Sequence, residues 1–168
     1  MTTANEITIA VMVVSILLLI AGVVLSFFPK RYAVAPAYAG LLGIGLTAVH
    51  ASASTLVFWG VATAIVLAIG YMLPRAVATS RKGVGYITGA VLAGAFVGMV
   101  VSHGWMVVGA VAGALLGGIA YSKTPAGRPM EFPSSKFLNY LCAKGLPAVV
   151  TMCMVGTSVL WLAAILNQ

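Results

Sequence analysis

The chain has 168 residues, of which 62% are hydrophobic and only 7% are charged, and its mean hydropathy is +1.13. A water-soluble domain carries about a quarter charged residues, so this composition excludes an ordinary soluble fold and indicates an integral membrane protein. The formal net charge is +7, but the 9 Lys and Arg residues are spread over short polar segments instead of forming one basic stripe. Nucleic acid is therefore not an expected partner.

The first half of the chain contains three apolar segments. Residues 7–28 are numerous enough to cross a hydrocarbon core of about 30 Å as a helix. The residues before them lack the positive charge and cleavage site of a signal peptide, so this helix is expected to be retained. Residues 34–49 form a shorter segment, broken by Pro36 and several glycines. Residues 55–73 are again of spanning length and end at Pro74.

The fourth and fifth apolar segments, 84–101 and 105–121, carry regularly spaced glycines. In a water-soluble helix each interior glycine costs about 1 kcal/mol relative to alanine, whereas in a bilayer a glycine stripe lets another backbone approach closely. The short link Ser102–Gly104 makes the two segments antiparallel neighbours. We therefore predict a central glycine-zipper hairpin. Its helix-packing residues are Gly85, Gly89, Gly94, Gly98, Gly109, Gly113 and Gly117.

A polar loop with an interfacial helix is expected over 122–144, because Phe137 and Tyr140 have helical spacing between flanking lysines. The last span is predicted over 145–166, with a kink at Pro147. The chain is thus expected to be one integral membrane domain over 1–168, an all-α, polytopic helical membrane protein of about six helices. The hairpins within it are read either as full spans or as partly re-entrant elements, because both give the same charge pattern.

The basic residues fall in alternate regions between the apolar segments, so they share one face of the membrane. The positive-inside rule then places the basic loops in the cytoplasm and both termini outside, in a bacterial cytoplasmic (inner) membrane. Membrane lipids are expected partners of these loops. The residues proposed to contact anionic headgroups are Arg75, Arg81, Lys82 and Arg128.

Residues able to perform chemistry are scarce. The two carboxylates, Glu6 and Glu131, lie outside the apolar segments, which argues against a paired-carboxylate hydrolase and against a buried proton relay. His50 and His103 are too few for a zinc site, which needs three or four ligands. The two cysteines are expected to be packing residues. We therefore expect no enzyme, no catalytic residue, no metal and no cofactor.

The link Thr79-Ser80-Arg81-Lys82-Gly83 and the glycine run 109–117 resemble an uncharacterised bacterial membrane family, domain of unknown function 456. In such proteins a small basic link with serine and glycine similarly precedes paired glycine-striped helices. The Leu-Pro-Gly-like opening usual after the first helix is degraded here to Phe28-Pro29-Lys30. The likeness is specific only across 80–118. It implies a small polytopic membrane protein and carries no established activity or catalytic residues.

Two functions are consistent with these features. The first is a small non-enzymatic membrane protein whose glycine-zipper helices mediate tight helix packing, self-association or partner binding, as a homo-oligomer or within a larger membrane complex. The alternative is a transporter or channel for a small or lipid-linked solute, with the hairpins lining the path.

Overall fold

The computed structural model describes residues 2–28, 32–47, 52–73, 82–128 and 132–166. Every regular element within these residues is an α-helix. The helices are α1 (Thr2–Ser26), α2 (Val34–Thr47), α3 (Ala53–Met72), α5 (Val84–Val101), α6 (His103–Ser122) and α7 (Ser135–Leu166). The prediction of an all-α fold with about six helices is confirmed.

Five of these helices, all except α2, are long and apolar enough to cross a membrane. The 14 residues of α2 give a rod of about 21 Å, shorter than a hydrocarbon core of about 30 Å. The chain is therefore a multi-pass helical membrane protein in which one short apolar helix packs beside the spanning ones.

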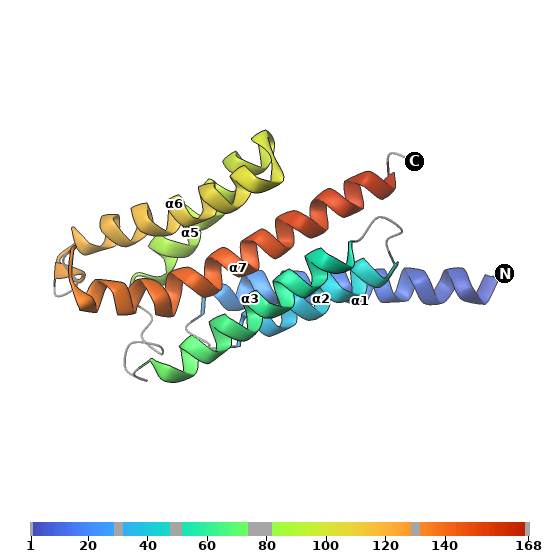
Figure 1. Cartoon of the computed structure of the whole chain (residues 1–168), viewed down its shortest axis with the longest axis horizontal. Helices are drawn as coiled ribbons and strands as arrows, with labels where there is room; N and C mark the ends of the chain where they lie inside the picture. Colours follow the sequence, from blue (N-terminus) through green and yellow to red (C-terminus); the bar gives the residue numbers. More distant parts are fainter. Residues whose placement is uncertain (1, 29–31, 48–51, 74–81, 129–131, 167–168) are drawn as a thin grey trace.

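Helix α7 lies at the centre of the molecule. It runs between the α5–α6 hairpin on one side and α1, α2 and α3 on the other (Figure 1), and it contacts all five of these helices. In the most apolar 18-residue stretch of α7, 56% of the residues are buried inside the protein, compared with 17% in the corresponding stretches of α1 and α3. Because the two outer groups contact α7 far more than each other, α7 is the element that joins them.

Several hydroxyl groups buried in this apolar interior are bonded to carbonyls of their own helices. On α7, the Thr157 hydroxyl donates to the Cys153 carbonyl at 2.9 Å and the Ser158 hydroxyl donates to the Met154 carbonyl at 2.9 Å. A bond between two helices runs from the Thr88 hydroxyl of α5 to the Ser26 carbonyl of α1 at 3.2 Å. These hydroxyl donors are thereby satisfied where no water reaches them. The buried Thr151 hydroxyl of α7 is an exception, because it has no hydrogen-bond partner within the described residues.

The prediction of a separate interfacial helix within 122–144 is wrong, because α7 starts at Ser135 and continues through Pro147 without a break. Its first turn is capped by the Ser134 hydroxyl, which accepts the Phe137 backbone N–H at 3.1 Å. Phe137 and Tyr140 are each 1% exposed. Their helical spacing therefore reflects packing against α6 rather than a face turned to lipid headgroups.

The α5–α6 hairpin is tighter than its sequence predicts. Helix α5 has the predicted bounds, Val84–Val101, but α6 begins at His103, two residues before the predicted start. Ser102 is the single residue between the helices, and its hydroxyl accepts the Trp105 backbone N–H at 3.4 Å. A side-chain cap of this kind satisfies one of the free N–H groups at a helix start.

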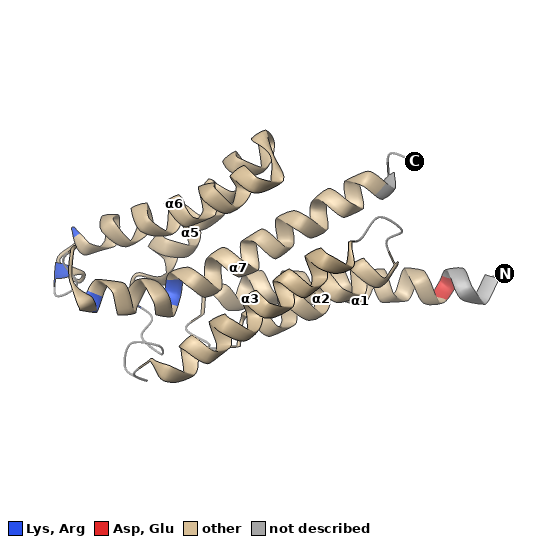
Figure 2. Ribbon diagram, in the orientation of Figure 1, with Lys and Arg blue, Asp and Glu red and all other residues tan. Residues whose placement is uncertain are grey.

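Charge is separated along the length of the molecule. Within the described residues, Lys and Arg gather at the end where α6 meets α7, while the acidic residue lies near the start of α1 (Figure 2). Helix α1 begins and α7 ends at the same end of the molecule, away from these basic residues (Figure 1). The start of α1 and the end of α7 therefore lie together at one end of the bundle, and the described cations lie toward the other end.

Candidate functional site

Helices α5 and α6 pack with their backbones in direct contact. A β-carbon built on Gly94 would strike the carbonyl oxygen of Gly109, and one on Gly109 would strike that of Gly94. A β-carbon on Gly113 would strike the Ala90 carbonyl oxygen, and one on Gly117 would lie 2.6 Å from that of Tyr86. We call this line of contact the seam. Only residues without side chains allow the two backbones to approach so closely.

Gly98 also lies in the seam, where an added β-carbon would be 2.7 Å from the Met106 Cα. Gly85 and Gly89 do not, because added β-carbons there would have no non-local heavy atom within 4 Å. The seam on α5 follows steps of four residues, through Ala90, Gly94 and Gly98. Gly85 and Gly89 are each one residue off this row, which turns them about 100° around the helix.

A shallow groove of about 550 Å³ runs along the outer side of the seam, and every residue lining it belongs to α5 or α6. We call it the outer groove. The larger side chains Val97 and Leu116 are 67% and 65% exposed, whereas Gly113 is buried between the helices. The lining residues are Ala90, Ala93, Gly94, Val97, Gly98, Val101, Trp105, Val108, Gly109, Ala112, Gly113 and Leu116.

The opposite side of the hairpin packs on α7. A cavity of about 210 Å³ lies there, lined by apolar residues that include Met99, Met106 and Met152 from three helices. A β-carbon built on Gly156 of α7 would strike the Met106 sulfur and lie 3.6 Å from the Met99 sulfur. Flexible thioether side chains are suited to filling an irregular gap of this kind. The hairpin therefore has one face covered by α7 and one face, the outer groove, without a covering helix among the described residues.

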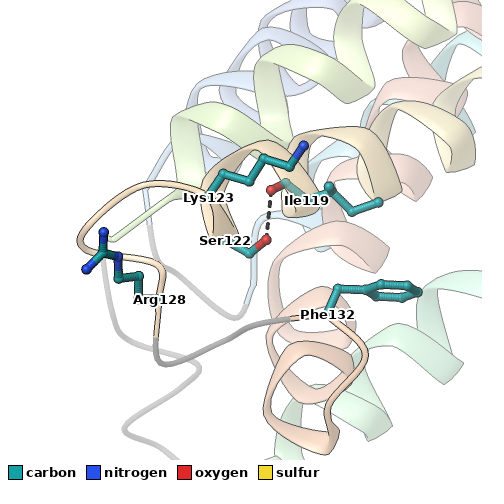
Figure 3. A pocket seen from close by; sticks show the side chains of 5 residues that line it. All are labelled: Ile119, Ser122, Lys123, Arg128 and Phe132. Atoms are coloured by element: carbon teal, nitrogen blue, oxygen red, sulfur yellow. Dashed lines mark hydrogen bonds between the residues drawn. The ribbon is translucent and has the colours of Figure 1, made fainter.

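A second hollow lies where α6 ends and the chain turns toward α7. It measures about 580 Å³ and is lined by two cations, Lys123 and Arg128, together with Ile119, Ser122 and Phe132. We call it the basic pocket. Figure 3 shows Lys123 and Arg128 leaving opposite ends of the turn, with Phe132 on the other side of the hollow. The Ser122 hydroxyl donates to the Ile119 carbonyl at 2.8 Å.

The residues predicted to contact headgroups fall in different places. Arg128 lines the basic pocket, and Lys82 is exposed at the start of α5. Arg75 and Arg81 lie outside the described residues. Lys123 was not singled out from the sequence, although its position directly after α6 is the signal that could have identified it.

The start of α5 is fixed against α6 and α7. Gly83 has a φ of 75°, in the left-handed region that favours glycine. An added β-carbon there would lie 2.7 Å from the Tyr121 ring. The Tyr140 hydroxyl donates to the Lys82 carbonyl at 3.2 Å, and the Tyr140 ring stacks on Tyr121 with centroids 5.3 Å apart. These contacts hold the residues that lead into α5 against the last turn of α6, next to the basic pocket.

His103 lies at the other end of the hairpin. It lines a cavity of about 390 Å³ between the α5–α6 turn and the first turns of α3, together with Trp59 and others. The buried indole N–H of Trp59 has no hydrogen-bond partner within the described part of the chain. His50 lies outside the described residues, and within them no three His, Cys, Asp or Glu side chains gather as a metal site.

The chain matches no protein-family model, no curated protein and no solved structure. The resemblance to domain of unknown function 456 therefore stays a prediction.

Proposed function

We propose that this protein is a small non-enzymatic membrane component that self-associates through the outer groove of its α5–α6 glycine-zipper hairpin. The observation that supports this most is the groove itself, most of whose lining residues are Gly or Ala and which has no covering helix among the described residues. Lipid tails are as apolar as these side chains, so helix association in a bilayer depends on close packing, which small residues permit.

A second copy of the chain is the occupant we favour, because the groove carries both protruding and recessed positions. Val97 and Leu116 protrude, and the β-carbons of Ala93 and Ala112 leave room beside them. In a two-fold dimer the same surface meets itself, so protruding residues of one copy can pack on the small residues of the other. A flat or uniformly bulky face does not offer this self-complementarity.

The proposal is tested by a substitution that places a larger side chain in the outer groove and leaves the seam glycines unchanged. Ala112→Leu adds a large side chain to the exposed face of α6, and we expect it to convert dimers to monomers, measured by single-molecule photobleaching in lipid bilayers. Val57→Leu is the matched control, because Val57 is 64% exposed on α3, away from the hairpin. Unchanged stoichiometry in the Ala112→Leu variant would contradict the proposal, and so would a monomeric parent protein.

For the location we propose a bacterial cytoplasmic membrane, with the basic end of the bundle in the cytoplasm and both termini outside. The separation of the described cations from both ends of the chain supports this orientation. Labelling of single cysteines from outside intact cells tests it: a cysteine at Lys123 should be protected, and one at Glu6 should react.

A transporter or channel is the second candidate, favoured by one observation. The cavity beside His103 separates the two helix groups at one end of the bundle, and a buried indole donor lies among its lining residues. Proteoliposomes holding the protein should then take up a small solute, and Trp59→Phe should change the rate. Absence of uptake over a broad panel of solutes argues against this alternative.

A further inference from the structure

The turn that carries the basic pocket is held in one shape by hydrogen bonds. After α6 ends, the Thr124 N–H and hydroxyl both reach the Tyr121 carbonyl, at 2.9 and 2.7 Å. The Gly127 and Arg128 N–H groups donate to the Thr124 carbonyl at 3.0 and 3.1 Å. A β-carbon on Gly127 would strike the Tyr121 carbonyl oxygen, so the turn lies directly on the helix end. The backbone positions of Lys123 and Arg128 are therefore fixed at two sides of the same hollow, and their exposed side chains extend from there (Figure 3).

Lys123 and Arg128 are the charged groups among the described residues that line the pocket. The end of a helix ordinarily adds partial negative charge through unpaired carbonyl groups. Here the carbonyls of Ile119 and Tyr121 accept bonds from Ser122, Lys123 and Thr124, which reduces that contribution. The described residues that line the pocket include no carboxylate. Of the two acidic residues, Glu6 is at the far end of the molecule and Glu131 lies outside the described residues.

Apart from Ser122, the remaining walls of the pocket are apolar, and they lie at the end of a helix long enough to span a membrane. Ile119 belongs to the last turn of α6. The Phe132 ring is 54% exposed and rests edge-on against Phe137, with centroids 5.2 Å apart. Two cations next to an exposed aromatic ring and an aliphatic wall match the boundary between a lipid headgroup and its acyl chains.

From this arrangement we propose that the basic pocket binds the phosphate group of an anionic phospholipid, with Lys123 and Arg128 as its two cationic contacts. Ile119 and Phe132 lie against the glycerol and the upper acyl chain. Phosphate is the shared chemistry of a lipid headgroup and of free phosphate, and the apolar walls favour the lipid as its source. This site is independent of self-association through the outer groove, because the groove lies along α5 and α6 and does not include the turn after α6.

The test uses the full-length protein in detergent and native mass spectrometry with added phosphatidylglycerol or phosphatidylcholine of the same acyl chains. We expect a one-to-one adduct with phosphatidylglycerol that phosphatidylcholine forms much less readily. Lys123→Gln and Arg128→Gln should each weaken it about fivefold, as expected for one cation near a lipid surface. Lys136→Gln removes the same charge from an exposed position on the first turn of α7, outside the pocket, and should leave the adduct unchanged.

Two further measurements separate the alternatives. Excess inorganic phosphate displaces the lipid if free phosphate is the natural ligand and leaves it bound if the lipid is; both results keep the phosphate site. Glu131→Gln should bind lipid at least as tightly, because it removes a negative charge from the loop. Equal binding of the two lipids, equal weakening by Lys136→Gln, or weaker binding by Glu131→Gln would overturn the proposal. Circular dichroism of each variant verifies that the helices persist.

Discussion

The two helix pairs α5–α6 and α1–α2 both use glycine for close packing, but they place different atoms opposite it. In α5–α6 an added β-carbon at Gly94 or Gly109 strikes a backbone carbonyl of the partner helix. In α1–α2, a β-carbon added to Gly22 would lie 2.7 Å from the Ala37 β-carbon. A β-carbon added to Gly43 would strike the Ser15 hydroxyl. The α1–α2 pair faces a backbone carbonyl only at Gly40, 2.6 Å from that of Ser15.

This difference determines how each pair tolerates a larger residue. The Ser15 hydroxyl opposite Gly43 can rotate away from an added methyl group, whereas a backbone carbonyl moves only if the whole helix moves. The Ala37 β-carbon opposite Gly22 is bonded directly to the backbone and cannot rotate away either. We therefore expect α5–α6 to be rigidly determined by its glycines and α1–α2 to be adaptable at Gly43.

The largest expected effect is at the centre of the seam. Gly113→Leu forces a side chain against the Ala90 carbonyl and should lower the free energy of unfolding by about 3 kcal/mol or more, since the two backbones must separate. Unfolding in mixed detergent micelles containing dodecyl sulfate, followed by circular dichroism, measures it. Gly89→Leu is the control on the same hairpin, at a position with open space. If the two variants are equally destabilised, the seam is not where the structure places it.

A smaller effect is expected in α1–α2. Gly43→Ala should cost about 1 kcal/mol, because the Ser15 side chain can rotate away by giving up its 2.6 Å bond to the Val11 carbonyl. In a Ser15→Ala background the cost should fall, since only the β-carbon of residue 15, 3.1 Å away, is left as a side-chain obstacle. A double-mutant cycle on unfolding free energies gives this coupling. If Gly43→Ala lowers the unfolding free energy equally in both backgrounds, the clash is with the backbone and not with the Ser15 side chain.

The smallest effect has the opposite sign. Gly85→Ala and Gly89→Ala meet no neighbouring atom within 4 Å, so each should stabilise α5 by about 0.5 kcal/mol through the higher helix propensity of alanine. The same unfolding measurement applies. Destabilisation by either substitution would show that a partner contacts this face of α5.

The fold class and most helix positions can be predicted from the amino-acid sequence without the structure. A backbone in hydrocarbon must satisfy its own hydrogen bonds, so apolar composition and length are sufficient to predict helices. The bounds of α5 show this, since 84–101 follows directly from where apolar residues begin and end. The positions of Lys123 and Arg128 were also readable, but not that hydrogen bonds fold the turn between them onto α6.

Which face of each helix meets a neighbour, in contrast, follows from how the helices pack together. These helices are apolar nearly all round, so they have no polar stripe that reveals an orientation. For this reason Gly85 and Gly89 could not be told apart from the seam glycines, and the glycines of α2 read as breaks instead of contacts. The continuity of α7 through Pro147 has the same origin: the surrounding helices bury Phe137 and Tyr140 on one side of the proline and Met154 on the other.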